Sequence, residues 1–188
     1  MAVTTANLLL GPATLYQGVF GATEPADTNV AINATPAASA WTDMGGTMDG
    51  VTLKIDQTYT ALEVDQIVDR AGSRLTKRDM SVETSLAEAT LENLSVLMNG
   101  GTAASGAGYK TFEPSFASSA TQPNYTALLF DGWGANSFRR RVIVRKVLNT
   151  DSVELAYTKD KQTVLKAAFS AHYVSSVLAP LHIAEATS

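Results

Sequence analysis

Two groups of residues have types and spacing that could support chemistry, and both fall short of a recognised motif. Gly101 and Gly106 have the spacing of the glycines of a phosphate-binding loop, but Ala107-Gly108 stand where that loop needs Lys and Ser or Thr. His172 and His182 are the only histidines and the chain has no cysteine, which argues against a multi-histidine or thiolate metal site. No Gly-x-Ser-x-Gly nucleophile elbow occurs. We therefore predict a protein that is not an enzyme and uses no metal or cofactor.

A basic cluster is one of the two charge patterns that remain. Its members surround the apolar run 142–144, and they are Arg139, Arg140, Arg141, Arg145 and Lys146. A basic stripe is the footprint of phosphate contact. The alternative, which we favour, is an edge strand or subunit contact whose arginines pair with a neighbour's carboxylates. On that interpretation Arg139, Arg141 and Arg145 are the inter-subunit candidates.

The second charge pattern lies on a predicted β-hairpin. Residues 51–66 alternate as a long strand, 67–74 form a polar tip and 75–84 return as a second strand. The apolar phase slips at 59–61, which predicts a bulge or sharp bend there. One face then carries four carboxylates: Glu63, Asp65, Asp79 and Glu83.

A single helix is expected directly after the hairpin, over residues 86–99. Ser85 and Glu88 have the spacing of a capping box, in which each side chain satisfies a free backbone amide. Apolar residues follow at helical spacing. Asn99-Gly100-Gly101 provides the expected C-terminal stop, because glycine adopts a left-handed cap without strain.

The rest of the chain predicts β-structure separated by small-residue segments. Residues 22–39 read as a loop or extended arm and 100–124 as a flexible, irregular insertion. The last third resembles a meander, with strands at 140–148, 152–158 and 163–174. We therefore expect one domain, 1–188, that is mainly β: an antiparallel β-sandwich or barrel with one flanking α-helix and a long β-hairpin.

Composition narrows the classes of function. The chain has 188 residues, of which 45% are hydrophobic and 17% charged, as in an ordered globular protein. Its net charge of −4 argues weakly against a dedicated nucleic-acid binder. No apolar run is long enough to span a membrane, and no Lys or Arg precedes Lys54, so neither a membrane partner nor a secretory signal is expected. The lack of cysteine fits synthesis in a reducing cytoplasm.

Several segments in order resemble the major tail tube proteins of long-tailed, siphovirus-type bacteriophages. The first half carries the likeness, and the second half follows only in strand layout. The matching segments are Leu10–Tyr16, Trp41–Thr47, Asp65-Gln66 and Ser85–Leu94. The tube proteins of type VI secretion systems share the fold.

The resemblance implies a structural virion protein, made in the bacterial host cytoplasm, that stacks as hexameric rings into a tail tube for DNA ejection. It places the acidic hairpin face on the lumen, where DNA passes without specific binding, and implies tape measure, tail terminator and baseplate proteins as partners. We expect the segments 22–39 and 100–124 to contact neighbouring rings. The hairpin loop, with Asp69, Arg70 and Arg74, is expected to reach the adjacent ring. The alternatives are a nucleic-acid-binding β-barrel, and a head decoration or head–tail joining protein.

Overall fold

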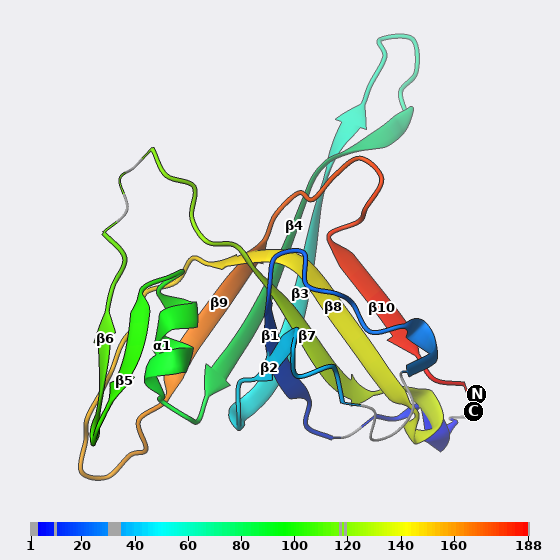
Figure 1. Ribbon diagram of the computed structural model, residues 1–188. Helices are drawn as coiled ribbons and strands as arrows, with labels where there is room; N and C mark the ends of the chain where they lie inside the picture. Colours follow the sequence, from blue (N-terminus) through cyan, green and yellow to red (C-terminus); the bar gives the residue numbers. More distant parts are fainter. Residues whose placement is uncertain (1–3, 10, 30–34, 117, 119, 188) are drawn as a thin grey trace.

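An antiparallel sheet forms most of the molecule (Figure 1). The computed structural model describes residues 4–9, 11–29, 35–116, 118 and 120–187. Within them the strands of this sheet run in the order β2-β1-β7-β8-β9-β4-β3, and β10 also pairs with β8. Their bounds are β1 Thr14–Val19, β2 Trp41–Asp43, β3 Thr47–Leu62, β4 Gly72–Leu86, β7 Thr126–Trp133, β8 Arg139–Asn149, β9 Leu165–Ala171 and β10 Leu181–Glu185.

The sheet curls into two layers around one main core. Strands from both ends of the strand order send side chains into the same buried cluster, including Leu15 on β1, Val144 on β8 and Leu86 on β4. The alternation of apolar residues predicted for the last long strand is confirmed, since Leu165, Ala167 and Phe169 on β9 are buried in this core. The predicted mainly β, antiparallel sandwich with one flanking helix is therefore confirmed.

A smaller cluster covers the opposite face of β1, β7 and β8. It comprises Tyr16, Trp41, Ala127, Leu129 and Ile143. The indole Nε1 of Trp41 donates a hydrogen bond of 2.9 Å to the carbonyl of Thr23, which satisfies the one polar atom of this buried ring. Burial of Tyr16 raises the pKa of its phenol above the ordinary value.

The predicted long hairpin is confirmed as β3 and β4, with different bounds at its tip. The strands end at Leu62 and begin again at Gly72, so Glu63 and Asp65 lie in the tip and not on a strand face. A bulge is present near the expected position, but the extra residue is Thr76 on the returning strand, between the pairs Thr58↔Lys77 and Tyr59↔Leu75. The bulge changes which residues of β4 share a face.

The helix is shorter than predicted and has a different cap. Helix α1 spans Leu91–Leu97, and the hydroxyl of Thr90 accepts a hydrogen bond of 3.1 Å from the backbone N–H of Asn93. The Ser85–Glu88 capping box was wrong. Ser85 belongs to β4, because pairing of β4 with β3 and β9 extends that strand through Leu86. Glu88 instead accepts a hydrogen bond of 3.0 Å from the backbone N–H of Gly46.

The small-residue insertion was also predicted wrongly in part. Residues 102–113 form a second hairpin, β5 (Thr102–Gly106) and β6 (Tyr109–Glu113), which packs beside α1. Its turn is Ala107-Gly108, with Gly108 at φ +84°. The run that suggested a phosphate loop thus forms a strand and a tight turn. Lys110 forms an ion pair with Glu92 of α1, which lowers the pKa of that carboxyl.

The predicted strand at 152–158 is absent from the ladder. Residues 152–164 have no strand partner. Hydrogen bonds from side chains connect them instead, such as the bond of 2.8 Å from the Thr163 hydroxyl to the carbonyl of Ala156. His172 is partly buried. Its ring meets the ring of Tyr125 edge-on, with the centroids 5.1 Å apart.

The cap assignment can be tested by substituting each candidate residue. We expect Thr90→Ala to lower the free energy of unfolding by about 1 kcal/mol, because the Asn93 N–H loses its acceptor. Ser85→Ala is the matched control and should cost less than about 0.5 kcal/mol, the usual range for surface substitutions. Urea unfolding followed by circular dichroism measures both changes. A larger loss of unfolding free energy for Ser85→Ala than for Thr90→Ala would support the capping box instead.

Candidate self-association surface

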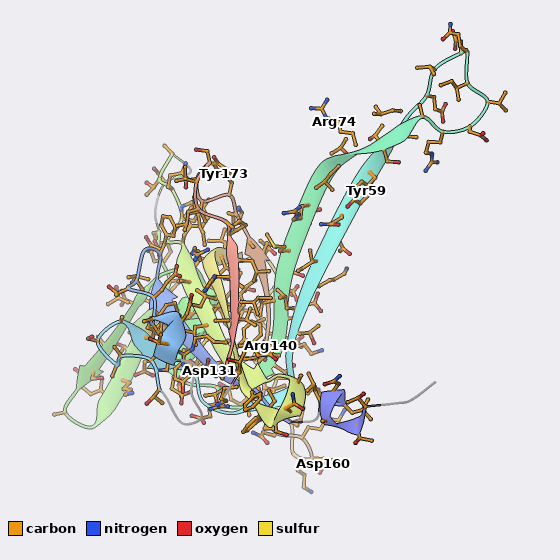
Figure 2. All side chains as sticks on the ribbon, turned by 90° about the vertical axis from the view of Figure 1, so that its right-hand side faces the viewer. Tyr59, Arg74, Asp131, Arg140, Asp160 and Tyr173 are labelled. Carbon is orange, nitrogen blue, oxygen red and sulfur yellow. The ribbon has the colours of Figure 1, made fainter. Side chains whose placement is uncertain are left out.

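The outer half of the long hairpin projects beyond the body of the protein (Figures 1 and 2). We call residues 56–79 the outer hairpin. Leu53 and Val82 still contact the core, but every described β3 residue from Lys54 to Thr60 is exposed. Both faces of the ribbon therefore contact solvent. Figure 2 shows it changing direction near Tyr59 and Arg74, next to the bulge.

Strand β3 has a free edge along its length. It is the last strand in the sheet order, and within the described residues only β4 pairs with it. An unpaired edge presents backbone N–H and C=O groups that can join another strand. Near its base β3 departs from regular pairing at Asp49 and Gly50, both with positive φ. This irregularity disfavours pairing with another strand only at that end of the edge.

The hairpin face expected to be acidic is balanced in charge. We call it the outer face: the side of β3, β4 and β9 that points away from the core, up to the bulge. Its register places three lysines and three carboxylates together: Lys54, Lys77, Lys166, Asp56, Asp79 and Glu83. Asp79 and Glu83 lie there as predicted, but the lysines cancel the expected negative excess.

Short ion pairs along each strand bring about this balance. Asp56 and Asp79 lie directly opposite each other across the hairpin. Lys54 contacts Asp56 at 3.0 Å and Lys77 contacts Asp79 at 2.7 Å, so each carboxylate has a cation on its own strand. Hydrogen bonding to the carboxylates raises the pKa of both lysines. These exposed pairs add little stability, but they prevent repulsion between the two aspartates.

The tip of the hairpin exposes apolar side chains as well as the expected polar ones. Val68 is fully exposed, and the other large apolar residues of the tip that are exposed are Leu62, Val64 and Ile67. Two backbone hydrogen bonds close the tip, from the N–H of Ile67 to Val64 and from the N–H of Ala71 to Leu62, each 3.1 Å long. A closed loop with several exposed apolar side chains is characteristic of a contact site.

The charged residues of the tip are free to meet a partner. They are Glu63, Asp65, Asp69 and Arg70 in the loop and Arg74 near the start of β4, and none belongs to an ion pair within the described residues. The position of Asp69, Arg70 and Arg74 thus fits the predicted inter-subunit role. Figure 2 shows Arg74 pointing away from the ribbon.

The basic cluster is used inside the chain, contrary to the prediction. Strand β8 is central, not an edge, because β7 lies on one side and β10 and β9 on the other. Arg141 is 3% exposed and forms a bidentate pair with Asp131, with two N–O distances of 2.7 Å. Arg140 pairs with Glu185 at 2.6 Å. Arg139 stacks over the ring of Trp133 at 5.0 Å.

Arg145 anchors the described part of the segment that was expected to be an arm. Its guanidinium contacts Glu24, with Nη2 2.9 Å from Oε2, and donates to the carbonyl of Ala179. Asp27, in the short helix η2 (Asp27–Asn29), lies 2.8 Å from His182 of β10. The described residues of 22–39 are thus held against the sheet, while residues 30–34 of that segment lie outside the described residues.

An apolar pocket of about 130 Å³ lies beneath this segment. Trp41, Ala127 and Ile143 from the smaller cluster line it together with Phe20, Val174 and Leu178. The remaining lining residues are Gly21, Ala22 and the ion pair of Glu24 with Arg145. Sequence reasoning missed this pocket because its walls come from strands and loops far apart in the chain. The one available signal was the apolar pair Val177-Leu178 beyond the last predicted strand.

Two searches of the described residues for other kinds of site found none. No group of three or more His, Cys, Asp or Glu side chains is placed to hold a metal ion. No helix in the described part is long and apolar enough to cross a membrane.

Comparison with known proteins does not assign this chain to a family. No protein-family model and no curated protein matches the sequence.

The ion pairs of the basic cluster predict that loss of Asp131 destabilises the fold more than loss of Glu185. Asp131→Ala should lower the free energy of unfolding by about 3–5 kcal/mol, because it leaves the Arg141 charge buried without a carboxylate. Glu185→Ala should cost about 1 kcal/mol or less, because the pair with Arg140 is partly solvated. Urea unfolding measures both changes.

Replacement of the whole buried pair provides the control. The double variant Asp131→Leu/Arg141→Met should recover most of the loss, because no unpaired charge remains. If Asp131→Ala were as mild as Glu185→Ala, the structural role of the buried pair would be contradicted.

Proposed function

We propose that this protein is a structural subunit that acts by self-assembly, as the tail tube protein of a long-tailed bacteriophage does. In this proposal copies close into rings, expected to be hexameric, and the rings stack into a tube through which DNA leaves the virion. The observation that carries the proposal is the outer hairpin, which extends past the core with a free edge and an apolar tip.

An exposed two-stranded ribbon of this length needs a partner. An isolated hairpin is marginally stable in water, since it buries neither face. Its free β3 edge is also open to uncontrolled strand pairing. Pairing of this edge with the hairpin of a neighbouring copy satisfies the backbone groups, and closure into a ring leaves no edge, as in a barrel. Self-assembly therefore supplies the strand partner that the free β3 edge lacks in a single subunit.

The charge of the outer face supports a conduit that does not retain DNA. Lysines and arginines bind phosphates with release of counterions, so a lumen with free cations would hold the genome. Two of the three lysines on this face are paired with carboxylates on their own strands. Between them lie hydroxyl and small side chains, including Thr52, Ser81 and Ser170. Such a lining fits transit without specific binding.

The partners and location follow from the same proposal. A tube in the virion is assembled in the host cytoplasm and requires a tape measure protein inside it and terminator and baseplate proteins at its ends. The basic cluster lends no support to the alternative of a nucleic-acid-binding barrel. Three of its arginines are paired with carboxylates of the same chain.

Removal of the outer hairpin tests the proposal. In the variant, Asn-Gly replaces residues 56–79 and joins Ile55 to Met80, which are already opposite each other in the register. We expect a folded monomer that forms no rings or tubes, because the pairing edge and tip are gone while the core contacts of Leu53 and Val82 remain. Negative-stain electron microscopy and light scattering measure assembly.

The matched control removes an exposed aromatic side chain outside the hairpin. Tyr157→Ser should assemble like the unmodified protein, since Tyr157 lies on the segment between β8 and β9. Rings or tubes formed by the truncated variant would contradict the proposal, as would an unmodified protein that stays monomeric at high concentration.

A further inference from the structure

We propose that the apolar pocket beneath Phe20 and Leu178 is the acceptor for the hairpin tip of a second copy of this chain. The inference rests on the self-association proposed above and adds the specific contact. It pairs two apolar features of the surface that have no partner within the chain: a protruding loop and a pocket.

The pocket has the character of a docking site for one or two aliphatic side chains. Its floor is apolar and buried, formed by Trp41, Ala127 and Ile143. Its rim is apolar but exposed: Phe20 is 44% and Leu178 42% accessible. Water in contact with this surface is released when an apolar side chain enters, which favours association.

Further exposed apolar residues extend the rim into a patch. Val177 is 93% exposed, and Val19 and Tyr173, next in sequence to the pocket residues Phe20 and Val174, are also exposed. Exposed apolar side chains beside an apolar pocket are typical of a protein contact. The apex of the hairpin tip matches it in character, with Ile67 and the fully exposed Val68 side by side.

Charges near the two features are complementary. The ammonium of Lys146 lies 5.3 Å from the centre of the Phe20 ring and 4.3 Å from that of Tyr125, and it belongs to no ion pair within the described residues. The loop between β3 and β4 carries three carboxylates, Glu63, Asp65 and Asp69, against the single cation Arg70, and these are likewise unpaired in the described part of the chain. Glu24 does not oppose them, because Arg145 already neutralises it. Docking would therefore bring tip carboxylates to a free cation.

The tip extends away from the pocket of its own chain, so the contact joins different copies. In Figure 2 the hairpin runs up and away from Tyr173, the neighbour in sequence of the pocket residue Val174. A tip that meets the pocket of the next copy makes a heterologous, head-to-tail contact. Repeated contacts of this type generate rings or helical filaments.

The cysteine-free chain permits a direct test by disulfide trapping. A Val68→Cys chain is mixed with a Val177→Cys chain and oxidised, because both side chains are exposed and a disulfide needs Cα atoms about 4.4–6.8 Å apart. We expect a linked dimer at several-fold higher yield than either variant gives alone. The control pairs Val68→Cys with Ser105→Cys on the β5–β6 hairpin, which should link only at background level.

A charge reversal separates specific docking from chance collision. Lys146→Glu in the Val177→Cys chain should lower the yield of linked dimer several-fold, and Asp69→Lys in the Val68→Cys chain should restore it. Assemblies that form without the Val68–Val177 link would overturn this inference and leave the proposed function intact. A chain that is monomeric at all concentrations and gives no link would overturn both.

Discussion

The structure depends on a mismatch in length between its longest hairpin and its core. Strands β3 and β4 have 16 and 15 residues, but the core is contacted only as far as Leu53 and Val82. Beyond that point each residue has lost backbone freedom without burying its side chain, which is unfavourable for an isolated chain. The ladder between the strands holds the ribbon together, but an outside contact must supply the missing burial. The long free edge of β3 lies on the same ribbon. The side chains that need burial and the backbone groups that need partners are therefore on the same surface.

Three arginines of β8 are paired with carboxylates within the subunit. Arg141 and Asp131 form a buried bidentate pair between neighbouring strands, and Arg145 and Glu24 fix a loop to the sheet. Removal of either buried partner would leave a charge that the interior cannot solvate. The exposed tip differs, because its acidic and basic residues have no such partners within the described residues. These paired arginines are thus not available to a partner, whereas the charged residues of the tip are, which favours the tip as a site of recognition.

Strand alternation was the most reliable guide in the sequence. It identified β9 and the long hairpin because a half-buried strand shows a two-residue period whatever its partners. The helix start was misjudged because Ser85 has the right spacing for a cap, but strand pairing on both sides extends β4 past it. The acidic face was misjudged because Lys54, Lys77 and Lys166 come from three strands that align only when the register is known. The arginine pairs and the apolar pocket join distant segments, so no local pattern could reveal them.

Amide hydrogen exchange of the outer hairpin tests the central claim most directly, because it reports on the backbone groups that are proposed to find partners. In dilute monomer, the β3 amides between Asp56 and Leu62 should exchange quickly, since the two-stranded ribbon opens easily. In the assembled fraction of the same preparation, separated by size, they should become strongly protected while amides of β9 change little. Slow exchange in the monomer would show that the ribbon is stable alone. Equally fast exchange in the assembled fraction would contradict the account.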